Sequence, residues 1–255
     1  MCPGESNFTP GEVKNVAAEL SSRKDAVVLT GAGISVASGV KPFRGKGGLW
    51  EKYDPYEVAH IESFRRNPQK AWEALKEIIE AVGQVAPNAA HLALARMEEL
   101  GIVRSVITQN VDGLHQAAGS KNVIEFHGNT RRLSCLGCSR GFTFEEVDLD
   151  ELPPRCPDCH EILRPAAVFF GEAIPHDALV QARSEAENCN AVLVVGTSAV
   201  VEPAASLPLI AKRRGVPIIE VNPESSPLTQ QADYFLQGNA EDVLPQLLEK
   251  LVISE

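Results

Sequence analysis

The stretch that decides the fold is AVVLTGAGIS, residues 26–35, in which a short apolar run passes directly into two closely spaced glycines. The run Ala26–Thr30 carries no charge, which is typical of a strand buried on both faces in a parallel sheet. Segments 103–110, 191–198 and 216–222 are also interpreted as strands, and helical patterns alternate with them. This alternation predicts an α/β fold with a mostly parallel sheet covered on both faces by helices.

Five helices are predicted from apolar residues that recur at helical spacing. They span residues 11–23, 68–82, 88–101, 203–215 and 239–252. Pro68 suits the first turn of its helix, Asn88 can cap the next helix, and Gly101 can end that helix. Residues 131–163 interrupt the pattern with four cysteines, three prolines and little periodicity, so we interpret them as a separate insertion.

Four of the six cysteines form two pairs with two residues between the partners, Cys135/Cys138 and Cys156/Cys159. This spacing predicts one zinc ion with four thiolate ligands, and the filled ligand shell makes that zinc structural rather than catalytic. The alternatives are two redox-active pairs or incidental buried thiols. Zinc ribbons can also bind nucleic acid, but the net charge of −10 opposes tight binding to phosphates, so direct nucleic-acid binding is not expected.

The location is expected to be cytoplasmic. No apolar run is long enough to cross a bilayer, and the first ten residues have neither the basic nor the apolar region of a secretory signal. Residues 1–20 also contain no Arg, which disfavours a mitochondrial presequence. We therefore expect no membrane partner.

The glycines after the first strand indicate a site for phosphate. Gly31 and Gly33 would let the backbone approach a phosphate closely, and Ser35 could donate a hydrogen bond to it. The dinucleotide fingerprint needs a third small residue where Val36 stands, and an ordinary strand–loop turn is the alternative. The glycine-rich loop 42–50 could close over a ligand as a lid, or could be a flexible surface loop.

Seven short motifs occur in the order found in sirtuins, the NAD-dependent protein deacylases, and the chain resembles their bacterial and archaeal catalytic cores. The motifs are GAGISVASGVKPFR, TQNVDGLH, EFHGN, the two cysteine pairs, FFGE, GTS and VNPE. They cover the chain from about Ala26 to about Leu244. The chain departs from the residues common in that family at Lys41, Val111 and Asn129. None of these three positions is expected to supply an atom that takes part in the chemistry.

The resemblance implies a large and a small domain, with NAD and an acetylated protein or peptide bound in the cleft between them. The large domain would be Rossmann-like, at about residues 1–42, 83–130 and 164–255. The small domain would combine the lid loop and a helical insertion, about residues 43–82, with the zinc ribbon, about residues 131–163. We expect the protein to be a monomer.

The resemblance also implies roles for individual residues. The NAD-binding residues would be Gly31, Ala32, Gly33, Ser35, Phe43, Arg44, Gln109, Asn110, Asp112, Gly196, Thr197, Ser198, Asn222, Glu224 and Ala240. His127 would be the general base, with Asn110 and Asp112 as further catalytic residues. The substrate backbone would pair with a strand made of Val168, Phe169, Phe170 and Gly171.

The implied reaction transfers an acetyl group from lysine to ADP-ribose, with release of nicotinamide and O-acetyl-ADP-ribose. NAD is thus a consumed co-substrate, and His127 would take a proton from the ribose diol, which suits a neutral imidazole. Two rivals stay open: a mono-ADP-ribosyltransferase that uses the same pocket, and a non-catalytic NAD-sensing or chromatin-binding module. His115 is interpreted as structural or pocket-supporting, and His60, His91 and His176 as having no role in catalysis.

The acyl group is constrained by two residues of the helix 68–82. Sirtuins that prefer succinyl groups carry a Tyr and an Arg where this chain has Leu75 and Ile78. Without a cation a buried carboxylate would be unpaired at high cost, so acetyl is expected to be strongly preferred over succinyl. A longer apolar acyl chain could also fit beside these two side chains.

Overall fold

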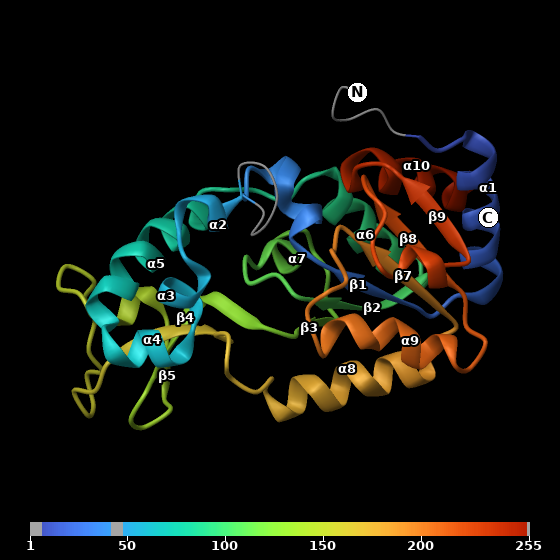
Figure 1. The fold of residues 1–255 in the computed structure, drawn as a ribbon. Helices are drawn as coiled ribbons and strands as arrows, with labels where there is room; N and C mark the ends of the chain where they lie inside the picture. The colour runs from blue at the N-terminus through green and yellow to red at the C-terminus, as the bar shows by residue number, and fades with distance from the viewer. Residues whose placement is uncertain (1–6, 42–47, 254–255) are drawn as a thin grey trace.

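A computed structural model describes residues 7–41 and 48–253 of the chain. Its main element is a six-stranded parallel sheet in the strand order β3-β2-β1-β7-β8-β9 (Figure 1). The strands are β1 (Ala26–Thr30), β2 (Val103–Thr108), β3 (Val123–Glu125), β7 (Ala191–Val195), β8 (Ile218–Asn222) and β9 (Tyr234–Gln237). The α/β class and the parallel sheet predicted from the sequence are confirmed.

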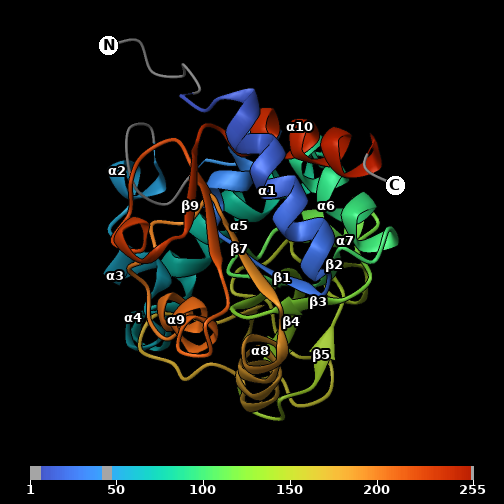
Figure 2. The same ribbon diagram turned by 90° about the vertical axis from the view of Figure 1, so that its right-hand side faces the viewer.

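Strand β1 lies at the centre of the sheet, and its side chains enter two cores in turn. Ala26 and Val28 belong to the core under α1, α6 and α10, whereas Val27 and Leu29 belong to the core under α8 and α9. Figure 2 shows the sheet between these two helical layers. The covering helices are α1 (Pro10–Arg23), α6 (Ala89–Glu99), α8 (His176–Asn188), α9 (Leu207–Lys212) and α10 (Ala240–Ile253).

The helix ends follow local chemistry. Thr9 caps α1 through its side chain, and the Glu12 side chain bonds back to the Thr9 backbone. Asn88 caps α6 as predicted, and Gly101 adopts a positive φ of 68° just beyond the end of that helix. Such caps supply partners for backbone groups that a helix end leaves unpaired.

Several predicted boundaries were wrong. The helix predicted for 203–215 is a 3₁₀ turn at Ala204–Ser206 followed by the short α9, whose first turn contains Pro208. Proline suits a first turn but not a helix interior, so the regular helix cannot extend far back. Strands β2 and β7 stop at Thr108 and Val195, before the polar residues that the prediction had included.

A second, smaller unit has its own sheet and core. An antiparallel sheet in the order β5-β4-β6 packs against a group of short helices that ends in α5 (Figure 1). The indole N–H of Trp72 on α5 donates to the carbonyl of Leu163, at 2.8 Å, and joins the two halves. The elements are α2 (Leu49–Lys52), α3 (Pro55–Ala59), α4 (Ile61–Arg66), α5 (Pro68–Gly83), β4 (Gly128–Cys135), β5 (Gly141–Phe142) and β6 (Leu163–Ala167).

The segments 49–83 and 128–167 thus share one hydrophobic core, although the exact domain boundaries stay a prediction. The remaining elements are short: α7 (Leu114–Ala117), and 3₁₀ turns at Ala32–Ser38, Phe144–Glu146 and Thr229–Gln231. In the described parts of the chain, no helix combines the length and the apolar character that a bilayer crossing requires.

Candidate functional site

The predicted NAD-binding residues gather where β1, β2, β7 and β8 end, at the carboxyl edge of the sheet, which is the usual ligand edge in such folds. Gln109 follows β2, and its side-chain amide donates to the Thr197 hydroxyl beyond β7, at 2.9 Å. The Asn222 amide at the end of β8 donates to the carbonyl of Thr197, at 2.8 Å. Three loops that are far apart in sequence therefore meet at Thr197.

The turns after β1 and β7 touch through their backbones. The N–H of Gly33 donates to the carbonyl of Gly196 at 2.7 Å, and that of Gly31 donates to the carbonyl of Val195 at 3.1 Å. A Cβ atom on Gly33 would lie 2.7 Å from Gly196 Cα, which no side chain tolerates. Both amides are bonded within the protein, and the absence of a side chain on these glycines allows the two turns to pack. The close approach of this backbone to a phosphate stays a prediction.

Beneath these turns lies a buried polar network around Asp112. The Ser35 hydroxyl donates to one carboxylate oxygen of Asp112 at 2.7 Å, and the N–H of Leu114 donates to the other at 2.9 Å. The Asn110 amide donates to Ser35 Oγ and to the carbonyl of Gly31, both at 3.1 Å. The Ser35 hydroxyl therefore joins Asn110 and Asp112 in one network, and its predicted contact with a phosphate stays a prediction.

His127 follows β3 and is half-buried beside this network. Its ring Nδ1 lies 3.1 Å from the carbonyl oxygen of Gln109. A carbonyl only accepts hydrogen bonds, so Nδ1 carries the proton and Nε2 has a free lone pair in the neutral ring. Burial lowers the pKa of His127, and the bond to Gln109 opposes that shift only in part. The ring is thus a neutral base at physiological pH.

The backbone around His127 is fixed by glycine geometry. Gly128 has a positive φ of 74°, and a Cβ there would lie 2.1 Å from the carbonyl oxygen of Ala166 on β6. The carbonyl of His127 also accepts the N–H of Val168, at 2.8 Å. His127 therefore lies at the junction between the large sheet and the small unit.

Two further histidines, His91 and His115, lie under the site and are fully buried. His115 Nε2 is 2.9 Å from the Thr30 hydroxyl, His91 Nε2 is 3.5 Å from the Ser35 hydroxyl, and the two rings meet edge to face at 4.9 Å. Burial lowers the pKa of His91 to about 4 and that of His115 to about 3. His91 was not predicted to belong to the site, and its only signal in the sequence was its place three residues after the cap Asn88.

Other predicted NAD-binding residues make fewer contacts. Ala32 begins the 3₁₀ turn after β1, and Ala240 is the buried first residue of α10. Ser198 and Glu224 are exposed at the ends of β7 and β8. Phe43 and Arg44 lie outside the described residues, as does most of the predicted lid.

The predicted substrate strand, residues 168–171, is not a strand in the structure. Strand β6 ends at Ala167, and Phe170 forms an isolated bridge with His60 outside any regular strand. The N–H of Phe170 donates to the carbonyl of Ala59, at 2.8 Å, and its carbonyl accepts the N–H of Ile61, at 3.1 Å. These backbone groups are occupied by the small unit, so the regular ladder stops.

The predicted acyl-contacting residues lie in the small unit. Leu75 is buried in its core, and Ile78 packs against that core. An apolar cavity of about 200 Å³ beside α5 is lined from another face of the helix by Trp72 and Ile79. A wider recess of about 640 Å³, near Arg104, lies at the opposite end of β2 from the site.

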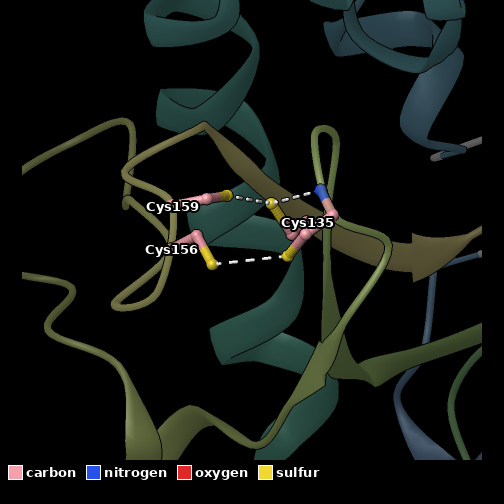
Figure 3. Close-up of side chains that lie close together, drawn as sticks. Cys135, Cys156 and Cys159 are labelled. Carbon is pink, nitrogen blue, oxygen red and sulfur yellow. Dashed lines mark hydrogen bonds between the residues drawn. The ribbon is translucent and has the colours of Figure 1, made fainter.

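The four predicted zinc ligands converge on one point. Their sulfur atoms all lie within 4.8 Å of one another, with 3.4 Å between Cys135 and Cys159 and 3.8 Å between Cys138 and Cys156. Zinc–sulfur bonds of about 2.3 Å in a tetrahedron place sulfurs about 3.8 Å apart, so the cluster can bind a zinc ion. Figure 3 shows Cys156 and Cys159 on one loop, facing Cys135 across the cluster.

The backbone around the cluster favours a thiolate. The N–H groups of Gly137 and Cys138 point at the Cys135 sulfur from 3.3 and 3.4 Å. Burial opposes ionisation, but these N–H groups, together with the neighbouring thiols of Cys159 and Cys138, lower the pKa of the Cys135 thiol to about 7. The donor set is four sulfurs with no position left for water, which fits a structural zinc.

Comparisons with known proteins agree on one family. Residues 31–203 match the model described as Sir2 family. The NAD-dependent protein deacylase of Pyrococcus furiosus is 49% identical over 246 residues, covering 94% of this chain and 97% of that protein. An ADP ribose complex of a mutant Sir2 homologue has a TM-score of 0.91 at 44% identity and covers 94% of this chain and 96% of that chain. A Sir2–p53 peptide–NAD+ structure has a TM-score of 0.87 at 37% identity, covering 94% and 99% of the two chains.

Removing one zinc ligand tests the metal centre. We expect Cys156→Ser to lose zinc and to lower the melting temperature by about 5 °C or more, because metal binding contributes directly to folding. Zinc content by elemental analysis and thermal unfolding check this. Cys189→Ser, a buried cysteine outside the cluster, should keep one zinc per chain. Full zinc content in Cys156→Ser would contradict the assignment.

The buried histidines predict a dependence of stability on pH. The unfolded chain binds protons at His91 and His115 below about pH 6.5, whereas the folded protein does so only near pH 4 and 3. The free energy of unfolding should therefore fall as the pH drops below 6.5, by up to about 1.4 kcal/mol per unit for each histidine. Urea unfolding between pH 7.5 and 5 measures this slope.

The exposed His176 provides the control, since His176→Gln should keep the wild-type slope. A free energy of unfolding that stays constant from pH 6.5 to 5 would show that the two buried rings do not resist protonation.

Proposed function

This chain belongs to the Sir2 family, and from that premise we propose that it is an NAD-dependent protein lysine deacetylase. The observation that carries the proposal is the bond between His127 Nδ1 and the carbonyl of Gln109, the residue before Asn110, because it leaves Nε2 as the unprotonated nitrogen of the neutral ring. A neutral base next to a nucleotide edge suits proton removal from a sugar hydroxyl. A purely NAD-sensing module would have no need of such a base.

Bound NAD would supply an electrophilic ribose carbon through loss of nicotinamide. Overall one water is consumed, the acetyl group passes from lysine to ADP-ribose as O-acetyl-ADP-ribose, and the lysine amine is set free. The protein's part is to position the reacting groups and to exclude bulk water from them. Asn110 and Asp112 form the floor of the nicotinamide site, where the buried network holds both rigidly. His127 accepts a proton at Nε2 from the ribose, while the carbonyl of Gln109 holds the ring by Nδ1.

The proposed substrate is an acetylated protein or peptide. The similar Sir2–p53 peptide–NAD+ structure supports a peptide as the substrate. In this chain residues 168–171 lie next to His127, because the N–H of Val168 donates to the His127 carbonyl. Phe170 is 40% exposed there, so an extended peptide can rest on its ring. We propose that this segment receives the substrate although it is not a regular strand.

Replacing the base tests the function. We expect His127→Ala to lower kcat for deacetylation of an acetyl-lysine peptide by about 10²–10⁴-fold, the usual contribution of a general base. NAD binding should persist, because the nucleotide edge is intact. Coupled assay of nicotinamide and peptide products measures the rates, and the exposed His176→Ala is the matched control.

A His127→Ala variant that deacetylates as fast as the wild type would refute the base assignment. Steady NAD consumption without acetyl-peptide, with ADP-ribose attached to protein, would instead support the transferase alternative.

The acyl preference is a second prediction. Leu75 and Ile78 bring no charge to the small-unit core, so a succinyl carboxylate would be buried without a partner. We expect kcat/KM for a succinyl-lysine peptide to be at least about 100-fold below that for the acetyl peptide, as a loss of 3 kcal/mol or more implies. Peptides of one sequence with either acyl group give the comparison. Similar values for both would contradict it.

A further inference from the structure

Glu220 is a fully buried carboxylate that the reaction does not use. It lies on β8, two residues before Asn222, and is 0% exposed. Among the described residues its partners are polar but uncharged. One oxygen accepts from the Ser226 hydroxyl at 2.5 Å and from the Asn222 amide at 3.3 Å, and the other accepts from the Thr229 hydroxyl at 2.6 Å. Burial of a carboxylate is costly, so such a group calls for an explanation.

The Ser226 and Thr229 hydroxyls each need an acceptor, and the two oxygens of the Glu220 carboxylate provide one for each. Ser226 Oγ already accepts the N–H of Leu228 at 3.1 Å, and Thr229 Oγ1 already accepts the N–H of Ser226 at 2.8 Å. Each hydroxyl proton is therefore directed at Glu220, which offers two acceptor oxygens. A glutamine would offer one oxygen and an NH₂ group, and one hydroxyl would lose its acceptor.

This network joins two segments of the proposed nucleotide edge. Through Ser226 and Thr229 it fixes the loop 223–229, which carries Glu224 and follows Asn222 directly. The same Asn222 amide that touches Glu220 donates to the carbonyl of Thr197 at 2.8 Å, and so reaches the turn after β7. The turn after β7 and the loop 223–229 are therefore both held through the Glu220 carboxylate.

We propose that Glu220 is a positioning residue for NAD, which holds the 196–198 turn and the 223–229 loop in the arrangement that receives the nucleotide. The inference rests on the proposed function for the identity of the ligand. Glu220 itself touches no substrate, since it is covered by the groups that it holds. Its loss should weaken NAD binding without altering the base at His127 or the peptide-binding segment.

The matched control lies at the opposite end of the same strand. Asp233 accepts the N–H of Ile218 at the start of β8 and pairs with Lys212, at 2.8 and 2.7 Å. Asp233→Asn therefore also weakens the hold on β8, but far from the nucleotide edge. A second pair isolates the hydroxyl: Thr229→Val removes it at nearly constant volume, and Thr229→Ser keeps it.

The test measures the Kd for NAD by calorimetry, KM for NAD and for acetyl-peptide, and melting temperature in zinc-loaded protein. We expect Glu220→Gln and Thr229→Val to raise the Kd and KM for NAD about tenfold, as loss of a hydrogen bond to a charged group does, while KM for the peptide stays within twofold. Asp233→Asn and Thr229→Ser should leave both values near wild type.

Equal effects of Glu220→Gln and Asp233→Asn on NAD, or equal increases in KM for both substrates, would overturn the proposal. If Glu220→Gln does not fold, an unchanged Kd for NAD in Thr229→Val overturns it. If the wild-type protein binds NAD but does not deacetylate, the proposed function is refuted. The proposal for Glu220 is still tested in that case, because it is judged by the Kd for NAD.

Discussion

The site depends on one steric constraint, the backbone contact between the turns after β1 and β7. Gly33 and Gly196 approach until any Cβ on either would meet the other's backbone, at 2.7 Å for Gly33 and within 2.9 Å for Gly196. The sheet order places the ends of β2, β1, β7 and β8 side by side, and this contact sets how closely the turns after β1 and β7 pack at that edge. Thr197, in the turn after β7, then receives bonds from the loop after β2 and from the end of β8.

Burial then sets the chemistry that this geometry permits. His127, His91 and His115 all have a lowered pKa because the protein interior disfavours the charged imidazole. Only His127 is half-exposed, with its Nδ1 bonded to a carbonyl and its Nε2 left as an acceptor. The other two rings support the Asp112 network from below. The same burial therefore keeps all three rings neutral, and only the ring of His127 is exposed enough to serve as the proposed base.

The features that the sequence could predict are those with local causes. The bounds of β1 and the capping of α6 by Asn88 follow from short-range patterns, and the zinc cluster follows from cysteine spacing. Helix α8 was not predicted because only Ala182 and Ala186 are buried on it, which leaves little apolar periodicity. The partners of Gly33 and Ser35, and the ladder that stops at Ala167, depend on contacts between distant segments. The motifs located the site but could not give its hydrogen bonds.

The central claim is that this edge cleaves NAD and transfers an acetyl group to ADP-ribose. Mass spectrometry of the products from purified, zinc-loaded protein with NAD and an acetyl-lysine peptide tests it most directly. The account predicts free-lysine peptide, nicotinamide and O-acetyl-ADP-ribose in equal amounts. Deacetylated peptide accompanied by free acetate and intact NAD would contradict it.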